Sequence, residues 1–291
     1  MNKVFSLVVK ALFFILLILM GAAFLLPILY KKEITESVRK VINENINGEF
    51  KFKDASLTLF RDFPNLSLEI DKPELYSFVA NDTSRIFAAN EFVIYLNLWN
   101  IISRKEVLKI KGLELNSPDI FLKIYNDTLA NYDLVQSTGK EETKTEKGID
   151  LDIDLFKLSN GKLVYKDLPG GLDLILSEIN QNFSGIFRKE DLNIQTETEV
   201  GSIELKDGAI KYLDKAKLKF YLDLAIQDGQ SVYVIKRGEA TLNQLNVSTS
   251  GNVNFSENGS LILDLIFQSK ESKVKDLFSL IHNSFKGTWD Q

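Results

Sequence analysis

The sequence predicts a mainly β protein, in which an antiparallel sheet follows an N-terminal transmembrane helix and an amphipathic helix. An uncharged apolar run of about 20 residues, at 11–30, predicts the transmembrane helix. From Glu49 onwards, apolar and polar residues alternate with a period of two, which is typical of strands with one covered face. Turn-forming dipeptides, and no helix-length segments, separate these runs, which favours antiparallel strands over βαβ units.

The run at 11–30 has the length of a membrane-spanning helix. At about 1.5 Å of rise per residue it spans about 30 Å, the hydrocarbon thickness of a bilayer. A cleaved signal peptide is the alternative, but the run exceeds the usual apolar region and no A-x-A site follows it. Lysines flank both ends, so charge counting does not decide the orientation. The residues expected to anchor the chain in lipid are Leu12, Phe13, Phe14, Ile15, Leu16, Leu17, Ile18, Leu19, Phe24, Leu25 and Leu26.

Residues 31–48 predict an amphipathic helix next to the membrane. Apolar residues recur there at a spacing of three and four, which places them on one helix face. Gly48 is expected to end the helix. Two interpretations stay open, a helix that caps the following sheet and a helix that lies along the membrane surface. The apolar positions are Ile34, Val38, Val41, Ile42 and Ile46.

The body divides into a first β region at 49–136 and a second at 150–270. Between them, residues 137–149 form a charged segment without large apolar side chains, which we interpret as a solvated loop. In the second region, Asn160-Gly161 predicts a hairpin turn, and Arg237-Gly238 and Ser250-Gly251 are expected to separate further strands.

Two segments of the second region show the alternation most clearly. A wide sheet with one apolar face must cover that face with its own second layer or with a ligand. In a body tethered to a membrane, lipid competes with a protein core for this role. The candidate lipid-facing residues are Leu218, Phe220, Leu222 and Leu224 in one segment and Leu261, Leu263, Leu265 and Phe267 in the other.

Residues 271–291 are expected to form a short helix and tail. Their apolar side chains recur at helical spacing, and Ser272 stands where an N-cap is expected. The helix positions are Val274, Leu277, Phe278, Ile281 and Phe285.

The composition excludes several kinds of site. The chain has no cysteine, so disulfides, thiolate nucleophiles and zinc-thiolate centres are excluded, and a single histidine, His282, excludes a His-rich metal site. A formal net charge of −5 argues against a nucleic-acid partner, which needs a basic face. No nucleophile-elbow, P-loop, dinucleotide-binding or zincin motif occurs. We therefore expect no enzyme activity, no catalytic residues and no cofactor.

One group of three aspartates needs a separate interpretation. Asp150, Asp152 and Asp154 share one face of a predicted strand and could coordinate a hard cation. They lack the glycine turn and the spaced ligands of a calcium loop. We interpret them as a solvated strand face, so no metal site is expected.

Several stretches together resemble the AsmA-like proteins of the Gram-negative envelope, particularly the Bacteroidota type. The resemblance starts with the N-terminal stub, anchor and amphipathic helix, and continues through FKDASLTLFRDFPNLSLEIDKPEL, with its Phe63-Pro64-Asn65-Leu66 turn. It recurs in LSNGKLVYKDLPGGLDLILSEINQNFSG and in the segment from Leu242 to Ile281. These are strand and turn patterns without catalytic signatures, and they cover nearly the whole chain.

The resemblance implies a single-pass inner-membrane protein with residues 1–10 in the cytoplasm and its body in the periplasm. It also implies kinship with repeating-β-groove lipid transfer proteins, whose elongated, curved sheets carry acyl chains on a concave apolar face. Members of the family are longer, so the resemblance predicts a chain truncated at its C-terminus. The expected function is to bind or guide phospholipid for outer-membrane assembly and lipid homeostasis. The alternative is an anchored scaffold that binds envelope proteins and carries no lipid.

Overall fold

The computed structural model describes residues 14, 31–44, 46–79, 83–99, 103, 108–134, 149–187, 192–227, 231–255 and 260–269. Among these residues, no helix is both long and apolar enough to cross a bilayer. The predicted anchor at 11–30 lies outside the described residues apart from Phe14, which is helical and 63% exposed. The predicted C-terminal helix at 271–291 and His282 also lie outside them.

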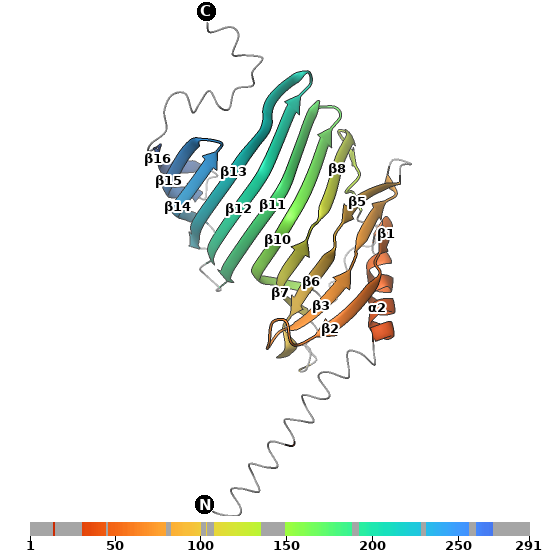
Figure 1. The fold of residues 1–291 in the computed structure, drawn as a ribbon. Helices are drawn as coiled ribbons and strands as arrows, with labels where there is room; N and C mark the ends of the chain where they lie inside the picture. Colours follow the sequence, from red (N-terminus) through yellow and green to blue (C-terminus); the bar gives the residue numbers. More distant parts are fainter. Residues whose placement is uncertain are drawn as a thin grey trace, which may run out of the picture.

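The fold is mainly β, a single open sheet of 16 strands in which most neighbours are antiparallel (Figure 1). Its first nine strands are β1 (Gly48–Lys51), β2 (Asp54–Thr58), β3 (Leu66–Asp71), β4 (Glu74–Ser77), β5 (Ser84–Ala88), β6 (Glu91–Leu96), β7 (Leu108–Asn116), β8 (Asp119–Asn126) and β9 (Leu129–Ala130). The others are β10 (Ile149–Asp167), β11 (Leu172–Phe187), β12 (Leu192–Asp207), β13 (Ile210–Gln227), β14 (Val232–Leu242), β15 (Leu245–Phe255) and β16 (Leu261–Gln268).

In the first part of the sheet, pairs of short strands such as β7 and β8 follow one another along the same line, with a short break between them. β10 pairs with β7 along its first half and with β8 along its second half, so two arms extend from it, β7-β6-β3-β2 and β8-β5-β4-β1. The breaks lie side by side, because Lys72 N–H donates to Asn90 O and Asn90 N–H to Asn116 O. Pro73 and Pro118 stand at two of these breaks, where a residue without an N–H cannot continue a ladder.

The prediction of a purely antiparallel sheet is wrong at one place. β10 runs parallel to both β7 and β8, so the sheet is mixed. The chain leaves β9, passes through residues 131–148 and returns to the starting end of β7 before β10 begins. Parallel neighbours require such a long connection, and the charged segment predicted as a loop at 137–149 supplies it. The loop itself lies mostly outside the described residues.

Three predicted turn dipeptides lie inside strands. Asn160-Gly161 interrupts the register of β10, Arg237-Gly238 that of β14, and Ser250-Gly251 lies within β15. Asn160 adopts a φ of 53°, and its N–H donates to the Asn180 side chain in place of a strand partner. Turn-forming residues therefore serve as β-bulges, which bend a strand and increase its twist.

Helix α2 (Lys31–Asn43) packs against β1 and β2 at one end of the sheet (Figure 1). Its exposed side carries the charged residues, and its apolar side contacts a buried cluster at Phe50, Phe52, Ala55 and Ile70. The interpretation of this helix as a cap on the sheet is thus confirmed. The predicted helix end at Gly48 is wrong, because α2 stops at Asn43 and Gly48 already belongs to β1.

Candidate functional site

One face of the sheet is largely apolar from β10 to β16, and its polar members include Gln181, Thr196, Thr198 and Thr249. Residues opposite each other on paired strands point to the same side, so the register identifies the members of a face. Between β12 and β13, Ile194 pairs with Leu224 and Val200 with Leu218. The pairs between β13 and β14 carry the face on to Ile235 and Leu242. We call this surface the apolar face.

The apolar face continues in both directions from β12 and β13. Towards β10 it takes in Leu158, Phe156 and Phe183, and towards β16 it ends on four side chains at the edge. Its members on β13 are Leu218, Phe220, Leu222 and Leu224, and on β16 Leu261, Leu263, Leu265 and Phe267. The structure therefore brings both groups of candidate lipid-facing residues onto one continuous surface.

Cover over this face is uneven. At the β1–β3 end, α2 lies on it, and near β12 a cluster around Val200, Ile203 and Ala216 is buried. The four β13 residues are half-buried. On β16, Leu261, Leu263 and Phe267 are 53%, 58% and 66% exposed. In the part of the chain that the structure describes, α2 is the only helix over the face, and no second sheet covers it.

The opposite face of the same strands is polar. Lys219 Nζ lies 2.6 Å from Glu199 Oε1, and Gln195 Nε2 donates to Asp223 Oδ2 at 3.2 Å. The hydrogen bond to Glu199 raises the pKa of Lys219, which stays protonated at neutral pH. Arg237 donates to both carboxylate oxygens of Glu239 at 2.8 Å. The cross-strand Lys219–Glu199 ion pair and the Arg237–Glu239 pair within β14 mark the face that water solvates.

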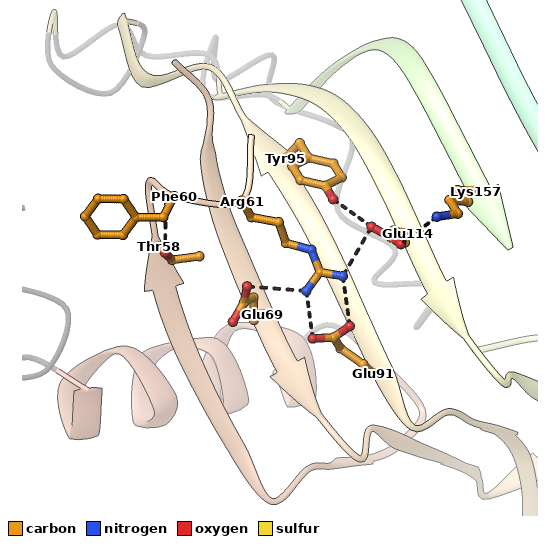
Figure 2. A network of polar contacts seen from close by, with 8 residues as sticks. All are labelled: Thr58, Phe60, Arg61, Glu69, Glu91, Tyr95, Glu114 and Lys157. Carbon is orange, nitrogen blue, oxygen red and sulfur yellow. Dashed lines mark hydrogen bonds and ion pairs between the residues drawn. The ribbon is translucent and has the colours of Figure 1, made fainter. Parts of the chain in front are cut away.

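The polar face also carries a charge network at β3, β6 and β7 (Figure 2). The loop between β2 and β3 turns back over the sheet and places Arg61 among three carboxylates. Arg61 Nη1 and Nη2 donate to the two carboxylate oxygens of Glu91 at 2.8 and 3.0 Å. The same guanidinium lies 3.4 Å from Glu69 Oε1 and 3.3 Å from Glu114 Oε2. Beneath this loop Val93 is fully buried.

Glu114 links the network to β6 and β10. The Tyr95 hydroxyl donates to Glu114 Oε2 at 2.7 Å, and Lys157 Nζ lies 3.4 Å from Glu114 Oε1. Burial acts to raise the pKa of Glu114, but the Tyr95 hydrogen bond and the charges of Arg61 and Lys157 outweigh it and lower this pKa. Burial and the bond to Glu114 raise the pKa of Tyr95 to about 12. Through Arg61 the network fastens the loop to β3, β6 and β7.

The sequence analysis missed this network, because its six members come from five separate segments: the loop between β2 and β3, and strands β3, β6, β7 and β10. The only local signal was an arginine two residues before Phe63-Pro64, a peptide that is cis in the structure. Of the three carboxylates considered as a cation site, Asp154 pairs with Lys111 Nζ at 3.0 Å. Among the described residues, no group of three or more His, Cys, Asp or Glu residues is arranged to hold a metal ion.

Comparison with known proteins adds no assignment. No family model matches the chain, and no curated protein matches it. The candidate functional site is therefore defined by the geometry alone, as a largely apolar face over which the described residues form no complete second layer.

Proposed function

We propose that the chain is a membrane-anchored protein that binds lipid acyl chains on the apolar face and guides phospholipid through the periplasm. The observation that carries the proposal is the continuity of this face from β10 to the exposed edge at β16, without a covering layer among the described residues. A large exposed apolar surface on a folded protein marks an interaction site. The run at 11–30 supports the choice of lipid as the occupant.

The dimensions of the face suit a hydrocarbon chain. Seven strands from β10 to β16 enclose six spacings of about 4.8 Å, or about 29 Å across the strands. One extended acyl chain fills half of a bilayer core, about 15 Å. Each methylene that moves from water onto the face contributes roughly 0.8 kcal/mol. A track of this width holds an acyl chain without any polar anchor.

The mechanism is passive and needs no catalytic group or cofactor. Leucine, isoleucine and phenylalanine side chains shield the acyl chains, and the headgroup stays in water beyond the strand ends. The polar face, with pairs such as Lys219 and Glu199, keeps the other side of the sheet solvated. Lipid therefore has only one side of the sheet to bind.

The test compares two neighbouring residues on opposite faces of β13. Leu222 lies on the apolar face and Tyr221 on the polar face. The full chain is purified in mild detergent, and bound lipid is extracted and quantified by mass spectrometry. We expect Leu222→Glu to lose most of the lipid and Tyr221→Glu to retain it. Equal lipid content in the two variants, or none in the unmodified chain, overturns the proposal.

A protein-binding scaffold remains the second candidate, and the edge strand β16 supports it. Apolar side chains are exposed on both of its faces, since Ile262 and Ile266 on the polar side are 55% and 56% exposed. An exposed edge with apolar residues can accept a strand from another protein. Crosslinking from β16 to an envelope protein, together with a lipid-free purified chain, would favour this function.

A further inference from the structure

Three aromatic side chains project from one end of the sheet. Phe60 and Phe63, in the loop between β2 and β3, are 62% and 78% exposed, and Trp99, after β6, is 68% exposed. We call these three residues the aromatic tip. Side chains of this size bury about 150–250 Å² when covered, so three that are more than half exposed form an apolar surface that a membrane can cover.

The register brings the aromatic tip together at a single end of the sheet. Thr58, the last residue of β2, pairs with Ser67 of β3, and Leu66 pairs with Leu96, the last residue of β6. The loop with Phe60 and Phe63 therefore leaves the sheet at the same end as the segment with Trp99. We call this the proximal end, and the end at which β13 begins is the distal end.

Helix α2 begins at the proximal end. Asn43, its last residue, bonds to Phe50 in β1, whereas Thr35, near its start, bonds to Ala55 in β2. β1 and β2 run towards the proximal end, so α2 runs antiparallel to them and its N-terminus points to that end. Residue 30 is covalently joined to Lys31, so the apolar run at 11–30 connects to the body at the side of the aromatic tip.

We infer that the aromatic tip contacts the bilayer surface and holds the proximal end of the sheet against the membrane. This inference rests on the proposed membrane anchor. Tryptophan and phenylalanine favour the boundary between headgroups and acyl chains, where an apolar ring meets a polar surface. Lys32, at the start of α2, is exposed at the same end and suits the phosphates of the headgroups. The strands then stand with their proximal ends at the membrane.

The absence of cysteine allows a direct test with single reporters. Trp99→Cys and Phe60→Cys place a nitroxide label on the aromatic tip of the full chain. Tyr212→Cys places the same label at the distal end, at a residue that is 47% exposed. Leu263→Cys reports on the apolar face. Each labelled chain is reconstituted into phospholipid vesicles, and the accessibility of the label to oxygen and to a water-soluble nickel complex is measured.

We expect labels at Trp99 and Phe60 to be several-fold less accessible to the nickel complex than the label at Tyr212, and more accessible to oxygen. Equal accessibility at the two ends overturns the inference. The label on Leu263 separates this result from the proposed function. If the label at Leu263 is shielded from the nickel complex but the labels on the aromatic tip are accessible to it, only the membrane contact is rejected. A shielded tip with a water-exposed Leu263 supports the contact and rejects lipid on the apolar face. Failure of the chain to float with the vesicles rejects the contact and its anchor.

Discussion

At the scale of single residues, the Arg61 guanidinium links the loop between β2 and β3 to strands β3, β6 and β7. It is 28% exposed and shares two parallel hydrogen bonds with Glu91. Paired N–H groups and carboxylate oxygens form the strong geometry for such bonds. Through Glu114 the same group is linked to Tyr95 and β10. Val93, which lies between Glu69 and Glu114 in the register, is fully buried on this side of the sheet.

The first prediction concerns this arginine. Arg61→Ala leaves partly buried carboxylates without their cation, so we expect the free energy of unfolding to fall by about 1.5–3 kcal/mol. Arg85→Ala is the matched control, since Arg85 pairs with Glu74 and Asp119 but is 45% exposed. A surface pair contributes less than about 1 kcal/mol. Urea unfolding measures both, and equal losses would contradict the special role of Arg61.

The second prediction concerns acid stability. The folded chain lowers the pKa of Glu114 below its ordinary value of 4.5, so folding favours the charged form. The stabilisation is complete above the unfolded pKa and is lost as the pH falls through the folded pKa. We expect Glu114→Gln to lower stability at pH 7 and to flatten the loss of stability as the pH falls from 7 to below the ordinary carboxyl pKa of 4.5. Urea midpoints across this range check it, and an unchanged acid slope would refute it.

At the scale of elements, α2 closes an end of the sheet that would otherwise expose apolar side chains and backbone. Asn43 accepts a hydrogen bond from Phe50 N–H at 2.6 Å and donates one to Phe50 O at 3.1 Å. Its amide thus imitates a neighbouring strand at the edge formed by β1. The Phe50 and Phe52 rings, whose centroids are 5.5 Å apart, pack against the apolar side of the helix.

The third prediction concerns this junction. Asn43→Ala leaves both backbone groups of Phe50 without a protein partner, and we expect a loss of about 1–3 kcal/mol in the docking of α2. Lys40→Ala, on the exposed side of the same helix, should change stability by less than about 0.5 kcal/mol. Amide hydrogen exchange at β1 and β2 is the measurement. Similar exchange rates in the two variants would show that Asn43 does not hold the helix.

The bulges shape the strands at this scale as well. At Gly251, φ is 131° and an added Cβ would collide with the Asp264 carbonyl, so only glycine fits between β15 and β16. Asn160 and Glu178 adopt left-handed φ values of 53° and 55° inside β10 and β11. Neighbouring bulges bend several strands together, which gives a wide open sheet its curvature.

At the scale of the whole molecule, an apolar face that stays open contributes less to the free energy of folding but leaves a surface for binding. The face is half-buried at β13 and exposed at β16, so its apolar area contributes less to folding than a closed core would. A ligand that binds only the folded chain restores the difference.

The fourth prediction follows from this linkage. Removing bound lipid should lower the thermal unfolding midpoint, and adding phospholipid back should restore it. At a lipid concentration of about 100 times Kd, the gain is about 2.7 kcal/mol. The Leu222→Glu variant should show no such gain. A midpoint that is independent of lipid in the unmodified chain would mean that the apolar face holds no lipid.

The sequence alone was enough to predict which residues share a face. The alternation of Leu218, Phe220, Leu222 and Leu224 determines their side of β13, because side chains on a strand point to opposite faces in turn. It was not enough to distinguish a turn from a bulge at Asn160-Gly161. Both use the same left-handed backbone, and the partner strand decides between them.

Local pattern therefore determined the β class, the amphipathic helix α2 and the two-sided character of the strands. Only the tertiary structure decided that β10 runs parallel to β7 and β8, that Arg61 meets Glu69, Glu91 and Glu114, and that α2 covers just one end of the apolar face. Periodicity reports the environment of each residue along its own strand. Register, strand order and cover depend on contacts between segments far apart in the chain, which no local pattern specifies.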